Sequence, residues 1–92
     1  MLNVRYTSQF KKDFKLALKR GKDEKLFVEI LNKLRNQESL PEKNKDHQLT
    51  GNWNHHRECH IESDWLLIYS VDNDTLILEL VRMGTHSDLF GK

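Results

Sequence analysis

The 92-residue chain is short enough that we expect a single domain spanning residues 1–92, and its 37% hydrophobic and 32% charged residues are typical of a soluble globular protein. Its apolar runs are too short to cross a bilayer and no signal peptide is apparent, so we expect a cytoplasmic protein with no membrane partner. The single cysteine, Cys59, excludes an internal disulfide and fits a reducing compartment, and the net charge is only +1.

A short strand followed by two helices is predicted at the start of the chain. The segment "LNVRY" alternates as a strand does, and an apolar stripe at helical spacing then predicts a helix over residues 8–20 that ends at Gly21. The members of this stripe are Phe10, Phe14, Ala17 and Leu18. Asp23 opens a second helical pattern that should stop near Asn36. Because the turn between the helices is short, an antiparallel helical hairpin is expected.

The first of these helices carries a block of positive charge. Residues 1–22 hold seven basic side chains and one acidic side chain, so the rest of the chain is net negative. Lysines concentrated on one element attract polyanions such as nucleic-acid phosphates, although a solvated helix face that happens to use lysine explains them equally well. The lysines on the predicted helix are Lys11, Lys12, Lys15 and Lys19.

The second half of the chain reads as three strands. The segments "WNHHRECHI", "WLLIYSV" and "TLILELVRM" are separated by turn-like clusters that are short enough for antiparallel hairpins. The predicted architecture is therefore an α+β fold of order β-α-α-β-β-β, with an antiparallel-rich sheet and both N-terminal helices packed on one of its faces. The opposite face is expected to be open to solvent or ligand. The long irregular segment at residues 36–52 is a candidate binding loop.

The first of the three strands combines ionisable and apolar residues. Since side chains alternate across a strand, Glu58 and His60 should share one face while Cys59 and Ile61 point into the core. We therefore expect Glu58 and His60 on the exposed face, about 7 Å apart, with room for one phosphate between them. A histidine exchanges protons near neutral pH, which makes the pair usable for acid–base chemistry, although an ordinary polar surface explains the pattern as well.

Other chemistries have weaker support in the sequence. Five histidines and one cysteine invite a zinc site, but no Cys-x-x-Cys or His-Glu-x-x-His pattern occurs, so no metal is expected. Cys59 alternates with His60 and is expected to be a buried, inert residue rather than a nucleophile. No glycine-rich phosphate loop or dinucleotide fingerprint is present, so no cofactor is expected.

Three motifs in the second half of the chain closely resemble one toxin family. "KDHQLTGNW", "RECHIESDWLLIY" and "RMGTHSDLFG", in this order after two helices, resemble the YafQ branch of the RelE/ParE toxins of bacterial toxin–antitoxin modules. The resemblance implies a fold like that of microbial ribonucleases and a metal-independent endoribonuclease that cleaves messenger RNA in the ribosomal A site and so inhibits translation. It also implies a DinJ-like antitoxin as the partner, with operator DNA bound only through the toxin–antitoxin complex.

The resemblance also assigns roles to individual residues. Matching the family motifs to this sequence gives a catalytic set of His47, Glu58, His60, Asp64, Arg82 and His86. Phe90 matches the aromatic position expected to stack on RNA, and the four lysines of the first helix are expected to contact ribosomal RNA. Two departures from the family pattern are Ser63 before the "DW" pair, which bears on the aim of Asp64, and His56 where an aromatic residue is common.

These residue types fit RNA cleavage by the neighbouring 2′-hydroxyl. The reaction needs a base for that hydroxyl, an acid for the 5′ leaving oxygen and positive charge for the transition state, and histidine, glutamate and arginine supply them. The sequence does not assign base and acid among His47, Glu58, His60 and His86. Two alternatives remain: a ParE-like gyrase poison, which would not need this set of histidines, and a non-catalytic binding module that acts as a co-repressor with its antitoxin.

Overall fold

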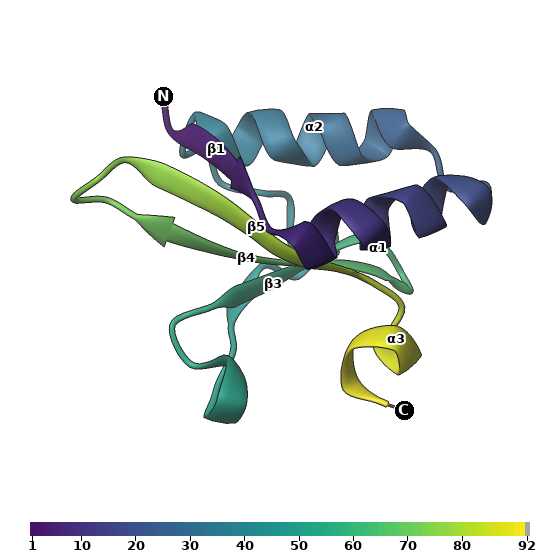
Figure 1. Cartoon of the computed structure of the whole chain (residues 1–92). Helices are drawn as coiled ribbons and strands as arrows, with labels where there is room; N and C mark the ends of the chain where they lie inside the picture. Colours follow the sequence, from purple (N-terminus) through teal and green to yellow (C-terminus); the bar gives the residue numbers. More distant parts are fainter. Residues whose placement is uncertain (92) are drawn as a thin grey trace.

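The computed structural model describes residues 1–91 and consists of a five-stranded sheet, two long helices and a short third helix (Figure 1). The strands are β1 (Asn3–Tyr6), β2 (His47–Gln48), β3 (Arg57–Glu62), β4 (Trp65–Asp72) and β5 (Ile77–Gly84). The helices are α1 (Ser8–Lys19), α2 (Glu24–Arg35) and α3 (His86–Phe90), and short 3-10 turns lie at Glu42–Asn44 and Gly51–Trp53. The α+β class and the predicted order of elements are confirmed, with β2 and α3 as additions. No helix in the described part of the chain is long and apolar enough to cross a membrane.

Both long helices begin and end within a residue of the predicted positions. The hydroxyl of Thr7 accepts a hydrogen bond from the backbone N–H of Phe10 at 2.9 Å, which satisfies one of the free N–H groups in the first turn of α1. Asp23 caps α2 through the backbone N–H of Lys25. Gly21 adopts a φ of 83°, a conformation that glycine takes without strain, and so lets the chain reverse between the two helices.

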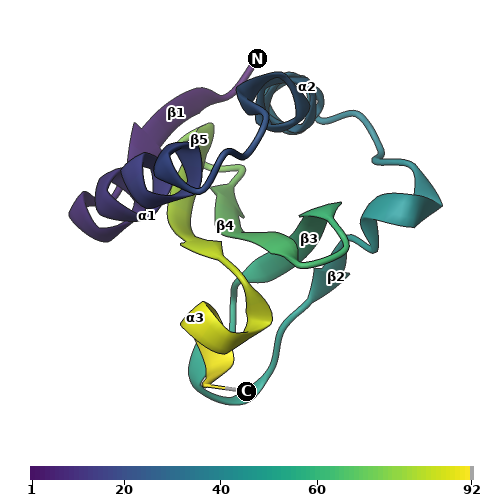
Figure 2. The same ribbon diagram turned by 90° about the vertical axis from the view of Figure 1, so that its right-hand side faces the viewer.

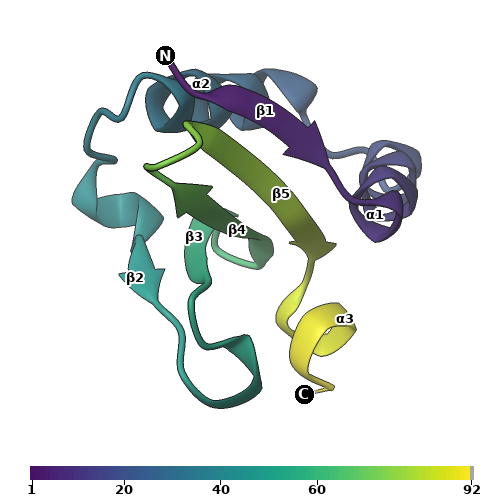
Figure 3. The same cartoon turned by 60° about the vertical axis from the view of Figure 1, so that its left-hand side comes forward.

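The sheet has the strand order β1-β5-β4-β3-β2 (Figure 3). β3, β4 and β5 pair antiparallel, as their short turns predicted, and β2 adds a two-residue antiparallel strand at one edge. β1 lies at the other edge and runs parallel to β5. A parallel pair needs a long connection, which the two helices and the intervening strands provide.

The main core lies between the sheet and the helices α1 and α2, which cover the same face (Figure 1). Buried side chains from the helices and strands meet there, among them Phe10, Phe27, Ile30, Trp65, Leu67, Leu78, Leu80 and Met83. Cys59 and Ile61 point into this core, as strand alternation predicted. Packing of the helices on this face fixes β3 and β4, which carry several residues of the candidate site.

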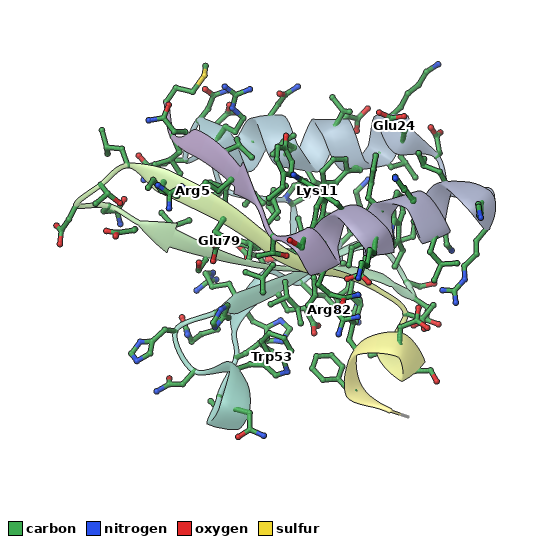
Figure 4. All side chains as sticks on the ribbon, viewed as in Figure 1. Arg5, Lys11, Glu24, Trp53, Glu79 and Arg82 are labelled. Atoms are coloured by element: carbon green, nitrogen blue, oxygen red, sulfur yellow. The ribbon has the colours of Figure 1, made fainter. Side chains whose placement is uncertain are left out.

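We expected the opposite face of the sheet to be open, and this was wrong, because the face carries a second, smaller apolar cluster. Leu66 and Ile68 of β4 are fully buried there together with Leu89 of α3. Partly buried side chains complete the cluster: Leu49, Trp53, Val81 and Phe90. Figure 2 shows α3 and the loop after β2 on the side of the sheet away from α2, and Figure 4 places Trp53 on this side.

β3 and β5 begin later than the sequence pattern indicated. β3 starts at Arg57, after the 3-10 turn at Gly51–Trp53, because His55 adopts a φ of 71° that a strand does not accommodate. β5 starts at Ile77, after Leu76 with a φ of 56°. Because a positive φ interrupts extended backbone, each strand begins only after this residue and not where the alternation of apolar and polar residues had predicted.

Candidate active site

Glu58 is the centre of a cluster of ionisable side chains on the face opposite to α1 and α2. It lies on β3, where it pairs with His47 of β2 on one side and with Ile68 of β4 on the other. Its carboxylate contacts two imidazoles, since the Oε1 atom lies 3.3 Å from Nε2 of His60 and 3.8 Å from Nε2 of His47. One carboxylate therefore links two histidines that lie far apart in the sequence.

Two expectations for Glu58 and His60 were wrong. Glu58 is only 4% exposed and the His60 side chain is 13% exposed, so the pair does not lie on an open surface. The two side chains contact each other directly, which leaves no room for a phosphate between them. They do share the face opposite to Cys59, as alternation predicted. The buried Glu58 is placed to orient the two imidazoles beside it.

His86 extends this cluster at its other end. Its ring lies edge-on to that of His60, with the ring centroids 5.5 Å apart. Its Nδ1 lies 2.6 Å from Oδ1 of Asp64, in the turn between β3 and β4, and its backbone N–H donates to the same oxygen at 2.8 Å. The backbone bond, followed by the imidazole bond, holds the pKa of the Asp64 carboxyl below its usual range. The cluster thus consists of side chains that lie next to one another in the order His47, Glu58, His60, His86 and Asp64.

The first turn of α3 fixes the backbone of His86. Thr85 and Asp88 form a capping box, in which the N–H of Asp88 donates to the Thr85 hydroxyl and the N–H of Thr85 donates to the Asp88 carboxylate. Asp88 also accepts a 2.6 Å bond from Nη1 of Arg20, which ties α3 to the end of α1. This bond is the main reason that the pKa of Asp88 is lowered to about 2. Gly84 permits the close approach, because a Cβ there would lie 2.9 Å from Cβ of Asp88.

Arg82 is held by Asp13 of α1 and not by the histidine cluster. Its Nε and Nη2 atoms donate to the two carboxylate oxygens of Asp13 at 2.8 and 3.2 Å, and the backbone N–H of Met83 donates to the same carboxylate at 3.1 Å. Burial raises the pKa of Asp13, but the bonds from Arg82, Gln9 and Met83 outweigh burial, so this pKa lies below its usual range. Figure 4 shows the Arg82 side chain between α1 and α3. The catalytic role of Arg82 stays a prediction.

The residues predicted to contact RNA lie in two separate regions. Phe90 of α3 is partly buried and packs against the second apolar cluster, so it supports this face as well as contributing to its surface. The four lysines of α1 are all exposed, and Figure 4 places Lys11 on the helix side of the sheet, away from Trp53. Within residues 1–91, no recorded hydrogen bond or ion pair joins these lysines to the histidine cluster.

Cys59 is fully buried and burial raises the pKa of its thiol, which confirms the prediction of an inert cysteine.

His56 lies in the loop before β3, with its ring edge-on to Trp53 and its Nδ1 3.0 Å from the carbonyl oxygen of Asn54. It is therefore outside the cluster. In the part of the chain that the structure describes, no group of three or more His, Cys, Asp or Glu side chains is arranged to hold one metal ion.

Comparison with known proteins identifies the family. Residues 2–91 match the family described as the bacterial toxin of type II toxin–antitoxin system, YafQ. The chain belongs to this YafQ toxin family. The mRNA interferase toxin YafQ of Escherichia coli (strain K12) is 43% identical over 90 residues, which cover 97% of this chain and 96% of that protein.

Solved structures of related toxins have the same fold. The crystal structure of a metal-bound toxin from Helicobacter pylori superimposes with a TM-score of 0.93 at 40% identity, covering 98% of this chain and 100% of that chain. The crystal structure of the E. coli DinJ–YafQ complex matches with a TM-score of 0.89 at 40% identity, covering 99% of this chain and 100% of that chain. These matches confirm the fold that the YafQ motifs predicted.

Sequence reasoning missed residues that hold this YafQ-family site together. The pattern from Thr85 to Asp88 is a capping-box signature, and reading it would have located α3. Asp13 has no comparable local signal, because its partner Arg82 is 69 positions away in the chain. Such a partnership becomes visible only once the fold brings α1 beside β5.

Proposed function

We propose that this toxin is a ribosome-dependent endoribonuclease that cleaves messenger RNA and thereby inhibits translation. The observation that carries this function is the cluster of neighbouring ionisable side chains from His47 to Asp64. It joins imidazoles, which exchange protons near neutral pH, to carboxylates that fix their orientation. General acid–base cleavage of RNA requires both features. The E. coli relative named as an mRNA interferase supports the same function.

Two half-exposed imidazoles of the cluster are suited to meet RNA. The side chains of His47 and His86 are 50% and 47% exposed, whereas His60 is mostly covered. Nδ1 of His47 lies 2.6 Å from the carbonyl oxygen of Lys45, and Nδ1 of His86 faces the Asp64 carboxylate. Both partners only accept hydrogen bonds, so each Nδ1 carries a proton and each Nε2 is the atom left for proton exchange.

In the proposed reaction the RNA 2′-hydroxyl attacks the neighbouring phosphate and the 5′ oxygen leaves. One imidazole takes the proton of the 2′-hydroxyl and another gives a proton to the 5′ oxygen, so protons balance over the step. The products are a 2′,3′-cyclic phosphate and a 5′-hydroxyl. We place these transfers on the histidines of the cluster, with Glu58 and Asp64 as the carboxylates that orient them.

The reaction also needs positive charge beside the phosphate and an aromatic surface that holds an unpaired base. Two of the guanidinium nitrogens of Arg82 bind Asp13, and its Nη1 is the group proposed to meet the phosphate. Phe90 and Trp53 offer aromatic surface for an unpaired base. The exposed lysines of α1 suit ribosomal RNA, where many phosphates share the contact. Because the site offers few groups of its own to hold RNA, we propose that the ribosome presents the message.

We further propose that a DinJ-like antitoxin binds and silences this toxin, as the E. coli DinJ–YafQ complex suggests. Operator DNA is then bound only through the toxin–antitoxin complex, a co-repressor role that is compatible with RNA cleavage. The cytoplasm, where translation occurs, is the proposed site of action. A ParE-like action on gyrase has no use for the histidine cluster and is not favoured.

Cleavage of a defined message on purified ribosomes tests this function. The wild-type protein should cut ribosome-bound message at discrete positions, mapped by primer extension, and should leave the same RNA intact without ribosomes. Equal cutting of messages with and without a start codon would contradict ribosome dependence. Cutting should persist when EDTA is added under conditions that keep the ribosomes intact. Its loss would refute the metal-free reaction, a relevant control given the metal-bound H. pylori relative.

A further inference from the structure

His47 has little support from its own strand. It opens β2, which is only two residues long and follows the irregular segment after α2. Half of its side chain is exposed, yet its Nε2 lies within 3.8 Å of the Glu58 carboxylate. The carbonyl oxygen of Lys45, 2.6 Å from Nδ1, also holds the ring, so the placement of the segment 45–47 decides where the imidazole lies.

Asp46, the residue before His47, is bound on the helix side of the sheet. Its Oδ1 accepts hydrogen bonds from the hydroxyl of Tyr69 at 2.5 Å and from Nε of Arg57 at 3.2 Å. Arg57 and Tyr69 are cross-strand partners on β3 and β4, and Tyr69 is 2% exposed within the main core. We call these three residues the Asp46 network. Since successive residues of an extended chain point to opposite faces, a bond from Asp46 to the core side directs His47 toward Glu58.

The hydrogen bonds of the Asp46 network are ones that the fold favours keeping. Burial, together with the bond to Asp46, raises the pKa of Tyr69, so the hydroxyl remains a proton donor at every pH at which ribosomes work. A buried hydroxyl without an acceptor costs about 1–3 kcal/mol, which favours keeping this bond. The buried Asn44 donates to the backbone carbonyl of His60 at 2.7 Å and so ties the same segment to β3 at a second point.

We propose that the Asp46 network positions His47 beside Glu58 and thereby sets the rate of the cleavage step. The inference rests on the proposed function, because it gives His47 a part in RNA cleavage. None of the three residues of the network needs to touch RNA, since each acts through His47 from the other face of the sheet. They are positioning residues, and their effect must disappear when the imidazole of His47 is absent.

A double-mutant cycle tests this dependence. Tyr69→Phe removes one hydroxyl from the network and keeps the ring that fills the core. In otherwise wild-type toxin it should slow single-turnover cleavage on saturating programmed ribosomes about tenfold or more, because small misplacement of a reacting group is costly. In a His47→Gln background the same change should cost less than about twofold. The concentration of ribosomes that gives half-maximal rate should not change in either background.

Equal losses in the two backgrounds would overturn the proposal, since the network would then act on something other than His47. Full activity of both Tyr69→Phe and Asp46→Ala would overturn it as well. Tyr6→Phe is the matched control, because it removes the hydroxyl of a 46% exposed tyrosine on β1. This control should cleave at the wild-type rate.

A second readout needs no cleavage, and so separates failure of this inference from failure of the proposed function. In free, ¹⁵N-labelled protein, the imidazole signals of His47 should shift or broaden in Tyr69→Phe and in Asp46→Ala, while those of His86 should stay in place. His47 signals that remain unchanged in both variants would refute the positioning role, whatever the ribosome assay shows. Thermal midpoints measured on the same samples show whether each variant is folded.

Discussion

The backbone N–H and the imidazole Nδ1 of His86 both bind one oxygen of Asp64, at 2.8 and 2.6 Å. The contact joins the turn between β3 and β4 to the start of α3, so it fixes the ring through two bonds that share an acceptor. The Asp64 side chain is 59% exposed, so the pair contributes little to the stability of the fold and mainly sets the orientation of the imidazole. We therefore expect the proposed cleavage to be sensitive to substitution of Asp64.

Asp64→Asn should slow cleavage without unfolding the protein. The amide oxygen can still accept the backbone bond, but it lacks the negative charge that strengthens the bond to Nδ1 of His86, so the imidazole is held less firmly and we expect a loss of about tenfold or more. Single-turnover cleavage on programmed ribosomes between pH 5.5 and 8.5 measures the effect. Asp74→Asn, in the exposed turn between β4 and β5, is the matched control. A near wild-type rate for Asp64→Asn would show that this carboxylate does not serve the reaction.

Replacing histidines by glutamine separates proton transfer from folding. Glutamine hydrogen-bonds but does not titrate, so His86→Gln should cost about 10²-fold or more in the cleavage step. Its thermal midpoint should stay within a few degrees of wild type, because the side chain is half exposed. Leu67→Ala, at a fully buried core position, should instead lower the free energy of unfolding by about 2–5 kcal/mol in urea titrations. Large destabilisation by His86→Gln would indicate a structural histidine.

Arg82 is expected to matter for stability as well as for catalysis. Arg82→Met leaves the buried Asp13 carboxylate without its main partner and should cost about 3 kcal/mol or more. Arg82→Lys keeps the charge and should retain part of both the stability and the cleavage rate. Urea unfolding and cleavage rates measured on the same samples distinguish the two roles. If Arg82→Lys is fully stable but inactive, the guanidinium itself is required by the reaction.

The bond from Arg20 to Asp88 gives a prediction for pH. The pKa of Asp88 is lowered from 3.8 to about 2, so the pair stabilises the fold above about pH 4 and loses this contribution as the pH falls toward 2. Because both side chains are partly exposed, Arg20→Met should lower the free energy of unfolding only slightly at pH 6. Unfolding by urea at pH 6 and at pH 2 should show this difference shrinking. Lys19→Met is the control, and an Arg20→Met deficit that is equal at both pH values would argue against the ion pair.

The helices and the core face could be predicted because their signals are local. Apolar residues at helical spacing, with Gly21 after the first helix and Asp23 before the second, placed α1 and α2 to within a residue. Alternation along β3 placed Cys59 in the core and Glu58 on the other face. These patterns depend on residues that are neighbours in the chain.

The burial of Glu58 could not be predicted from hydrophobic periodicity, because the elements that cover its face are too short to show one. β2 is two residues long and α3 is five, and neither length is enough for a hydrophobic period to develop. The motif resemblance placed Glu58 in one catalytic set with the histidines, but the direct contact of Glu58 with His60 required the structure. The same holds for Arg82, whose bond to Asp13 spans most of the chain.

β5 lies between β1 and β4, so an interior strand of the sheet is synthesised after both long helices and every other strand. A growing chain therefore cannot close its sheet until β5 has left the ribosomal exit tunnel, since pairing between distant segments must wait for both. α3, which brings His86 to His60, emerges later still. The topology therefore delays assembly of the candidate site until α3 has been synthesised.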